Sequence, residues 1–145
     1  MVKPEIMNPE YCTSQNLRKA ARTAARHYDQ ALQPVGLKTT QFTLLAKIQG
    51  AGEIAQNDLA NNVGLDKTTM SRNLRLLEKD ALVRISEADD RRIRLLSLSR
   101  KGERLLEKAK PLWRTAQSSF VDELGVDVWQ TLTAILQTIE PVENR

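Results

Sequence analysis

The apolar positions at the start of the chain fall at helical spacing. From about Thr13 to Leu32 they recur at steps of three and four residues and form a narrow, alanine-rich stripe, which is typical of one long amphipathic helix. Pro34 and Gly36 are expected to end this helix. Residues 1–10 contain two prolines and are predicted to be a loose arm. The stripe consists of Leu17, Ala21, Ala24, Tyr28 and Ala31.

A second helix is predicted from Leu37 to Ile48, with Thr39 or Thr40 as its N-cap. Its apolar residues include Phe42, Leu45, Ala46 and Ile48, and the glycines at positions 50 and 52 are expected to break it. Residues 54–55 then read as a short edge strand. These elements lead directly into residues 56–80, which carry the clearest motif of the chain.

Residues 56–80 hold two short helices with a tight break between them. The first covers about Gln56–Asn62 and the second about Lys67–Lys79. Gly64 suits the left-handed position that stops a helix, and Asp66 is a favourable N-cap for the next one. Two helices joined in this way predict a helix–turn–helix, whose second helix enters the DNA major groove in many DNA-binding proteins.

After the second helix, the apolar residues no longer follow helical spacing, and the pattern becomes typical of strands. Leu82–Ser86 and Arg92–Ser99 are β-like runs, and the polar segment EADDR between them is turn-like, which predicts a β-hairpin. Ser99 is a favourable N-cap for a long helix that ends near Gly125. A last helix is predicted over about Val126–Ile139. The predicted fold is therefore mainly α, with a small β-hairpin wing.

Length and composition narrow the class of protein. The chain has 145 residues with 41% hydrophobic and 28% charged residues, which suits one globular domain. It lacks both the run of about 20 apolar residues that crosses a bilayer and the apolar stretch of a secretory signal, so a cytoplasmic protein without a membrane partner is expected. One cysteine and one histidine argue against a disulfide framework and most metal sites. No cofactor is expected.

Positive charge is concentrated in the middle of the chain. Residues 66–110 carry thirteen Lys and Arg against eight Asp and Glu, whereas residues 111–145 carry two against five. A local basic cluster is typical of nucleic-acid binding, and a solvated basic face is the alternative.

The second helix of the pair has two distinct faces. At 100° per residue, Met70, Leu74 and Leu77 share the side that must face the core. Arg72 and Arg75 lie on the opposite side, where arginine can bind guanine edges and hydroxyls can bind bases or phosphates. An ordinary amphipathic surface helix remains the alternative. The candidate recognition residues are Lys67, Thr68, Thr69, Ser71, Arg72 and Arg75.

The hairpin tip supports the DNA-binding interpretation. Three arginines within four positions, Arg91, Arg92 and Arg94, repel one another and suit a place beside an anion such as a DNA minor groove. Asp90 is expected to pair with a neighbouring arginine and hold it in position. A charged turn that keeps the hairpin soluble is the alternative.

The segments LANNVGLDKTTMSRNLRLLEKDALV (59–83) and DDRRIRLLSLSRKG (89–102) resemble the MarR/OhrR-type winged helix–turn–helix regulators. Asp90, Arg92 and Gly102 meet the wing pattern of that family, and Ser99 stands where threonine is commoner. The resemblance extends over nearly the whole chain.

The resemblance implies a homodimeric transcriptional regulator that binds double-stranded DNA at a pseudo-palindromic operator. Residues 1–145 would form one winged helix–turn–helix domain, with 37–100 as the DNA-binding core and 11–33 and 103–145 as dimerisation helices. The apolar stripes at the two chain ends favour such a dimer independently. Many members are repressors released by a small phenolic or other anionic ligand, and the ligand site usually lies between the dimer helices and the winged part.

Other functions fit the sequence less well. An enzyme would need a phosphate loop, a nucleophile elbow or metal-ligand spacing, and none is present. His27 is interpreted as a surface or dimer-contact residue. A winged helix could instead dock a protein, although such domains usually lack a basic recognition face. Cys12 lies near the position of the peroxide-sensing cysteine in OhrR-type regulators and is a candidate redox sensor.

Overall fold

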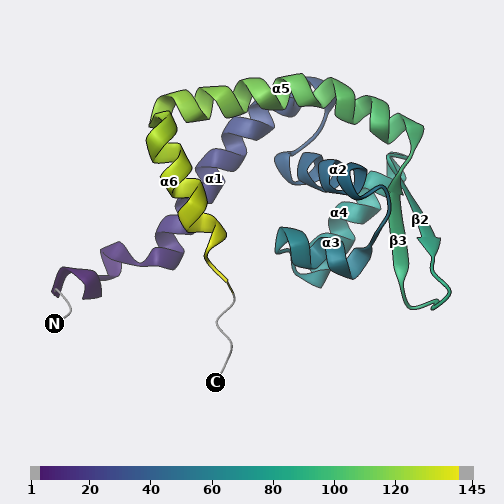
Figure 1. Cartoon of the computed structure of the whole chain (residues 1–145), viewed down its shortest axis with the longest axis horizontal. Coiled ribbons are helices and arrows are strands. Elements are labelled where there is room, and N and C mark those ends of the chain that lie inside the picture. The colour runs from purple at the N-terminus through teal and green to yellow at the C-terminus, as the bar shows by residue number, and fades with distance from the viewer. Residues whose placement is uncertain (1–3, 141–145) are drawn as a thin grey trace.

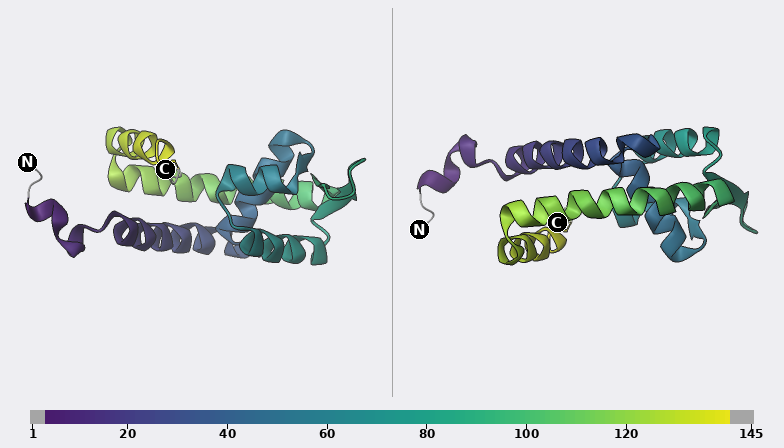
Figure 2. Two further views of the ribbon diagram at one scale, coloured as in Figure 1. Left: turned by 90° about the horizontal axis from the view of Figure 1, so that it is seen from below. Right: turned by 90° about the horizontal axis from the view of Figure 1, so that it is seen from above.

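The computed structural model describes residues 4–140; the ends of the predicted N-terminal arm and of the predicted 103–145 segment lie outside these residues. Figure 1 shows an arch with α5 along the top, α1 and α6 at one end, and α2, α3, α4 and the strands below the other. The two views of Figure 2 place α1 and α6 on opposite sides of α5. The helices are α1 (Thr13–Leu32), α2 (Thr39–Ala51), α3 (Gln56–Val63), α4 (Lys67–Lys79), α5 (Arg100–Leu124) and α6 (Val126–Gln137).

The predicted fold class is confirmed: helices dominate, and three short strands form one antiparallel sheet. The strands are β1 (Ile54–Ala55), β2 (Val83–Glu87) and β3 (Arg94–Leu98), in the order β1-β3-β2. Val83 pairs with Leu98 and Ile54 with Leu96. The predicted strand over Arg92–Ser99 is therefore too long, because residues 92 and 93 belong to the turn.

The N-terminal part of the chain differs from the predicted loose arm. Residues 4–7 and 9–11 form the short 3-10 helices η1 (Pro4–Met7) and η2 (Pro9–Tyr11), and Asn8 caps the second by accepting from the Glu10 backbone N–H. A third such helix, η3 (Gln33–Val35), continues α1 into a turn that Gly36 completes with φ 70°. Pro4 and Pro9 therefore each begin a short helical turn.

Helix α2 begins and ends later than predicted. Lys38 is its N-cap residue, its backbone N–H donating to Gln41 Oε1 at 2.9 Å. Thr39 is already helical and its N–H donates to Asp29 Oδ1 on α1 at 2.7 Å. Gly50 lies inside the helix, since one glycine costs a helix only about 1 kcal/mol.

The core lies beneath the basic end of α5. Leu44, Leu45 and Ile48 of α2 are fully buried there, together with Leu59 and Leu106. Helix α2 packs against α5 on one side and against α4 on another. Four aromatic side chains extend this core toward α1 in one continuous cluster: Phe42, Trp113, Tyr28 and Phe120.

The turn between α4 and β2 is joined tightly to the start of α5. Ser99 Oγ donates to the Ala81 carbonyl at 2.6 Å and accepts from the Gly102 N–H at 3.0 Å. A Cβ on Gly102 would lie 2.0 Å from the Leu82 carbonyl oxygen. Only glycine therefore allows this close approach, which fixes the strands relative to α5.

Candidate nucleic-acid interface

The turn between α3 and α4 sets the angle between the two helices. Gly64 adopts the left-handed conformation with φ 71°, and the Leu65 N–H donates back to the Ala60 carbonyl at 3.1 Å. Asp66 then caps α4 by accepting from the Thr69 N–H at 2.7 Å and from Thr69 Oγ1 at 3.0 Å. These hydrogen bonds lower the pKa of Asp66.

Helix α4 has the two faces that its sequence predicts. Met70, Leu74 and Leu77 are between 0% and 3% exposed. Arg72 and Arg75 are exposed on the opposite face. Among the described residues neither arginine makes an ion pair, so both side chains are open to a ligand.

Five of the six candidate recognition residues line one open depression of about 520 Å³: Lys67, Thr68, Ser71, Arg72 and Arg75. Thr69 is not among them: the residue is half-buried, and its hydroxyl donates to Asp66 Oδ2 at the start of α4. The structure therefore gives Thr69 a part in starting the helix, away from the depression.

The wing ends in a tight turn that positions one arginine. Asp90 Oδ1 accepts from the Arg92 N–H and from its Nε, each at 3.1 Å, and Asp90 Oδ2 accepts from Arg92 Nη2 at 3.0 Å. These bonds lower the pKa of Asp90 and raise that of Arg92. The predicted pairing is therefore present, and it holds the guanidinium of an arginine whose side chain is 90% exposed.

The other wing arginines lie on either side of this pair. Arg91 is exposed in the turn, and Arg94 begins β3. Arg92 and Arg94 line a small depression together with Gln56 and Asn57, the first residues of α3. Neither Gln56 nor Asn57 was predicted from the sequence as a site residue. The signal was the short strand at 54–55, because its pairing with β3 brings the first turn of α3 beside Arg94.

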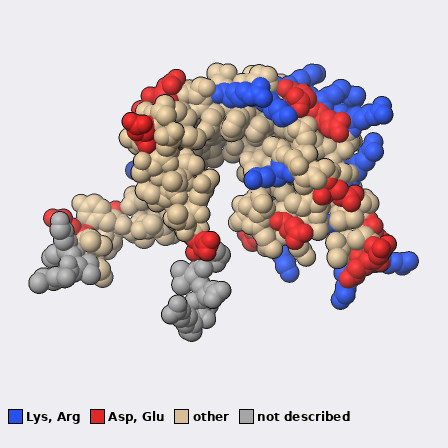
Figure 3. Space-filling model, in the orientation of Figure 1, with Lys and Arg blue, Asp and Glu red and all other residues tan. Residues whose placement is uncertain are grey.

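Charged side chains are distributed unevenly over the surface. In Figure 3, basic side chains gather along the half of α5 above the strands with a few acidic ones among them, both kinds lie at the wing tip, and acidic ones mark the turn toward α6. The positive charge of residues 66–110 therefore lies on the first half of α5 as well as on α4 and the wing.

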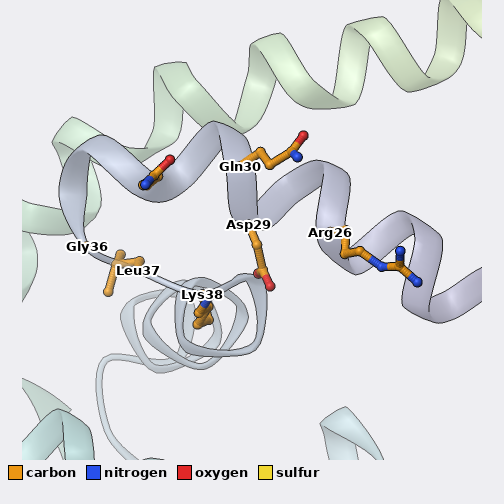
Figure 4. Close-up of a pocket in the computed structure, with 7 residues that line it drawn as sticks. Arg26, Asp29, Gln30, Gly36, Leu37 and Lys38 are labelled. Carbon is orange, nitrogen blue, oxygen red and sulfur yellow. The ribbon is translucent and has the colours of Figure 1, made fainter.

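A separate pocket of about 400 Å³ lies where α1 meets α2. Figure 4 shows Asp29 directed toward the start of α2 and Arg26 one helical turn earlier on α1. Lys38 and Leu37 complete its lower side. The pocket thus joins the helix at the N-terminal end of the chain to the first helix of the winged part.

The single cysteine and the single histidine of the chain lie apart from the winged part. Cys12 is exposed at the start of α1. His27 is half-buried and its Nε2 lies 2.9 Å from the Ala116 carbonyl of α5. It is therefore not a fully exposed surface residue, and a role for it as a dimer contact stays a prediction. The residues described contain no group of three or more His, Cys, Asp or Glu suited to a metal ion. Over these residues, no helix is both long and apolar enough to span a membrane.

Comparison with known protein families and sequences identifies relatives among transcriptional regulators. The family model described as MarR family matches residues 35–93. An uncharacterized helix–turn–helix-type transcriptional regulator of Bacillus cereus is 33% identical over 96 residues, which is 66% of this chain and 64% of the relative. The regulator YwoH of Bacillus subtilis is 24% identical over 92 residues, or 63% of this chain and 67% of the relative. The chain spans about two thirds of the length of these curated relatives.

Solved structures cover more of the chain. The transcriptional regulator MosR of Mycobacterium tuberculosis, in complex with DNA, is 36% identical with a TM-score of 0.77, covering 87% of this chain and 94% of that one. A mutant of MarR from Escherichia coli, complexed with operator DNA, has a TM-score of 0.79 at 22% identity, covering 88% and 93% of the two chains. The second likeness concerns the fold alone.

Proposed function

The chain belongs to the MarR family of winged helix–turn–helix regulators, and we propose that it is a sequence-specific DNA-binding transcriptional regulator. In this proposal it is a repressor that acts in the cytoplasm as a homodimer and carries out no catalysis. The observation that carries the proposal is the depression on α4, which gathers Lys67, Thr68, Ser71, Arg72 and Arg75 on one uncovered face. MosR, the relative at 36% identity, is in complex with DNA in its solved structure.

The chemistry of this face suits the DNA major groove. Arginine can bind guanine O6 and N7 with two parallel hydrogen bonds, and hydroxyls can bind either bases or phosphates. Arg72 and Arg75 would then read base edges, while Lys67, at the start of α4, would contact the backbone. Residues 37–100 would form the DNA-binding core.

The wing would bind the minor groove beside each half-site. Arg92 is the only one of the three wing arginines with a side chain paired to Asp90 among the described residues, so its direction is set before DNA arrives. Narrow A·T-rich minor grooves have a strong negative potential that attracts an inserted arginine. Arg91 and Arg94 would add backbone contacts.

A homodimer would place two copies of α4 on one pseudo-palindromic operator. The residues that would form the dimer belong to 11–33 and 103–145, and within these ranges α1 and α6 lie at the end of the arch away from the wing. Each half-site contributes its own contacts, and a dimer therefore binds much more tightly than one winged part alone.

Replacing the two arginines of α4 tests the placement of the recognition helix. Arg72→Ala and Arg75→Ala are each expected to weaken operator binding by about 1–3 kcal/mol and to relax specificity at one base position. Both residues are exposed, so thermal stability should hardly change. Fluorescence anisotropy with operator variants measures both effects, and Lys47→Ala on α2 is the matched control. Wild-type binding by both arginine variants would contradict this placement.

A protein-docking module is the alternative from a different class. DNA binding through 6–10 phosphate contacts should weaken about 10³- to 10⁵-fold between 50 and 200 mM salt. Anisotropy titrations over this range separate the two functions, because docking through apolar contacts depends little on salt. A flat profile would favour docking.

The pocket between α1 and α2 suits the proposed control by a small phenolic or other anionic ligand. Its volume of about 400 Å³ is within the usual range for ligand sites. Arg26 and Lys38 supply positive charge, and Leu37 supplies an apolar wall. Ligand binding here would change how α1 meets the winged part and so the distance between the two recognition helices.

Operator release distinguishes ligand control from cysteine control. A hydroxybenzoate is expected to release wild-type protein from operator, and to do so poorly when Arg26 or Lys38 is replaced by glutamine. Organic hydroperoxide should leave binding unchanged in wild type and in Cys12→Ser. Release of wild type by hydroperoxide, abolished in Cys12→Ser, would instead favour the peroxide-sensing alternative.

A further inference from the structure

The first half of α5 carries positive charge that the recognition helix and the wing do not account for. Arg100, Arg104 and Lys108 are exposed and follow one another at intervals of four residues. At 100° per residue they lie on the side of α5 opposite the buried Gly102, Leu106 and Ala109. We call Arg100, Arg104 and Lys108 the α5 stripe.

The α5 stripe is not neutralised by its neighbours. Within residues 4–140, none of its three side chains makes an ion pair or a hydrogen bond. Two glutamates lie on one flank. Of these, Glu107 already accepts from Lys110 Nζ at 2.6 Å and from Gln49 Nε2 at 3.4 Å, and Lys110 lowers its pKa. The other glutamate, Glu103, makes no ion pair among the described residues.

Like charges at this spacing repel each other and cost helix stability. Successive stripe residues are about 6 Å apart along the helix axis, since the rise is about 1.5 Å per residue. A row of cations at such intervals can bind several phosphates of a nucleic-acid backbone at once.

The α5 stripe lacks the apolar residues that a protein-binding or a membrane-binding surface needs. Protein interfaces depend on aromatic or large apolar residues at their centre, and a membrane-surface helix needs an apolar face. The exposed large apolar residues of the described chain lie on other elements, and none is on α5. Pure positive charge without an apolar contact favours a DNA backbone over a protein or a lipid surface.

The α5 stripe faces away from the proposed operator. In Figure 1 the outer side of α5 forms the upper edge of the molecule, whereas the wing tip and α3 form the lower edge. Figure 3 shows the basic side chains along that upper edge. An operator on α4 and the wing would therefore leave the α5 stripe free.

We propose that the α5 stripe is a second, sequence-independent DNA-binding surface, which holds a duplex other than the operator. The protein would then bridge two DNA segments. The surface does not depend on α4 binding DNA, and the two proposals can fail separately.

A capture assay tests this proposal. Operator DNA is immobilised, saturated with protein, and then exposed to a labelled duplex of unrelated sequence at 0.1 M salt. Wild type should capture the labelled duplex. Each phosphate contact changes the salt slope by about 0.9, so its loss should weaken capture about 8-fold at this salt concentration. Arg104→Gln and Lys108→Gln should each show this loss, and the double variant a loss of tens-fold, with operator affinity unchanged.

Two further variants make the result specific. Lys47→Gln removes one exposed charge from α2 and should capture the second duplex like wild type. Arg72→Ala combined with Arg75→Ala should lose operator specificity but still bind the unrelated duplex. Capture by the Arg104→Gln/Lys108→Gln variant at the wild-type level would overturn the proposal, as would an equal loss in Lys47→Gln.

Discussion

Asp90 shows how one carboxylate can serve a surface that binds an anion. Its three hydrogen bonds with Arg92 link the backbone and the side chain of the same residue. An exposed ion pair contributes little to stability, so the effect of the pair is on the direction of the guanidinium. The lowered pKa of Asp90 means that its carboxylate stays charged at more acidic pH than an ordinary aspartate does.

This geometry makes a prediction for the wing. Arg92→Ala should lower affinity most for operators with A·T-rich flanks, because the wing reads groove width and potential. Asp90→Ala should have part of the same effect, since the guanidinium is then free to turn, and neither change should alter the melting temperature. Competition binding with A·T- and G·C-flanked operators measures this. Equal losses on both flanks would exclude minor-groove insertion.

Residue identities alone predicted that Asp90 pairs with a neighbouring arginine, and the structure shows that this arginine is Arg92. They did not predict the partner of Thr69, whose hydroxyl donates to the carboxylate of Asp66 at the start of α4. A contact between Thr69 and DNA stays a prediction. Competition between a cap and a ligand for one hydroxyl depends on local geometry that the pattern does not contain.

Helix α4 depends on its first turn for its start. Because the hydrogen bonds from Thr69 lower the pKa of Asp66 in the folded protein, the cap stabilises the fold above the unfolded pKa of about 3.9. This stabilisation is lost as the pH falls through the folded value.

Asp66→Ala is therefore expected to lower the melting temperature by a few degrees at pH 7 and progressively less below about pH 4. Thermal melts followed by circular dichroism between pH 2.5 and 7 measure the difference. Asp122→Ala, an exposed position on α5, serves as the control and should not show this pattern. A difference from wild type that stays constant down to pH 2.5 would argue against a charged cap.

The contact between the strands and α5 makes a second prediction at this scale. Gly102→Ala would place a methyl group against the Leu82 carbonyl, and such overpacking typically costs about 1–3 kcal/mol. Chemical denaturation should show this loss, whereas Ser118→Ala on the exposed side of α5 should be nearly neutral. An unchanged midpoint for Gly102→Ala would mean that the turn can move away at little cost.

The elements themselves were largely predictable, and the reasons differ. The bounds of α1 and α4 match the prediction, because a strong amphipathic period ends at clear caps or breakers. The helix after Ser99 runs through Pro111 to Leu124 as one piece. The end of α6 at Gln137 falls short of the predicted Ile139, since apolar spacing alone does not show where helical hydrogen bonding stops.

At the scale of the whole molecule, α6 presents an apolar face with nothing upon it among the described residues. Ile135 is 54% exposed and Val128 57%. Leu132 extends the same face, and the exposed Ile139 follows just beyond the end of the helix. Exposed apolar surface of this extent is typical of an interface, and it lies at the end of the arch where a second copy would meet it.

Ile135→Glu is therefore expected to convert the proposed dimer to monomers and to reduce operator affinity by orders of magnitude, because each half-site would then be bound alone. Gln137→Glu adds the same charge to the opposite side of α6 and should remain dimeric. Light scattering coupled to size-exclusion chromatography gives the mass of both. A monomeric wild type, or a dimeric Ile135→Glu, would show that α6 is not the interface.

The single helix α5 contacts α1 at one end and α2 at the other, which restricts how its length can change in evolution. Inserting one residue would rotate the winged part by about 100° and shift it by about 1.5 Å, so the two ends would no longer face the same directions. An insertion of seven residues would nearly restore the phase and lengthen the arm by about 10.5 Å. Homologues that keep this architecture should therefore differ in α5 by about two whole turns or by nothing, and the spacing between their operator half-sites should change in matching steps.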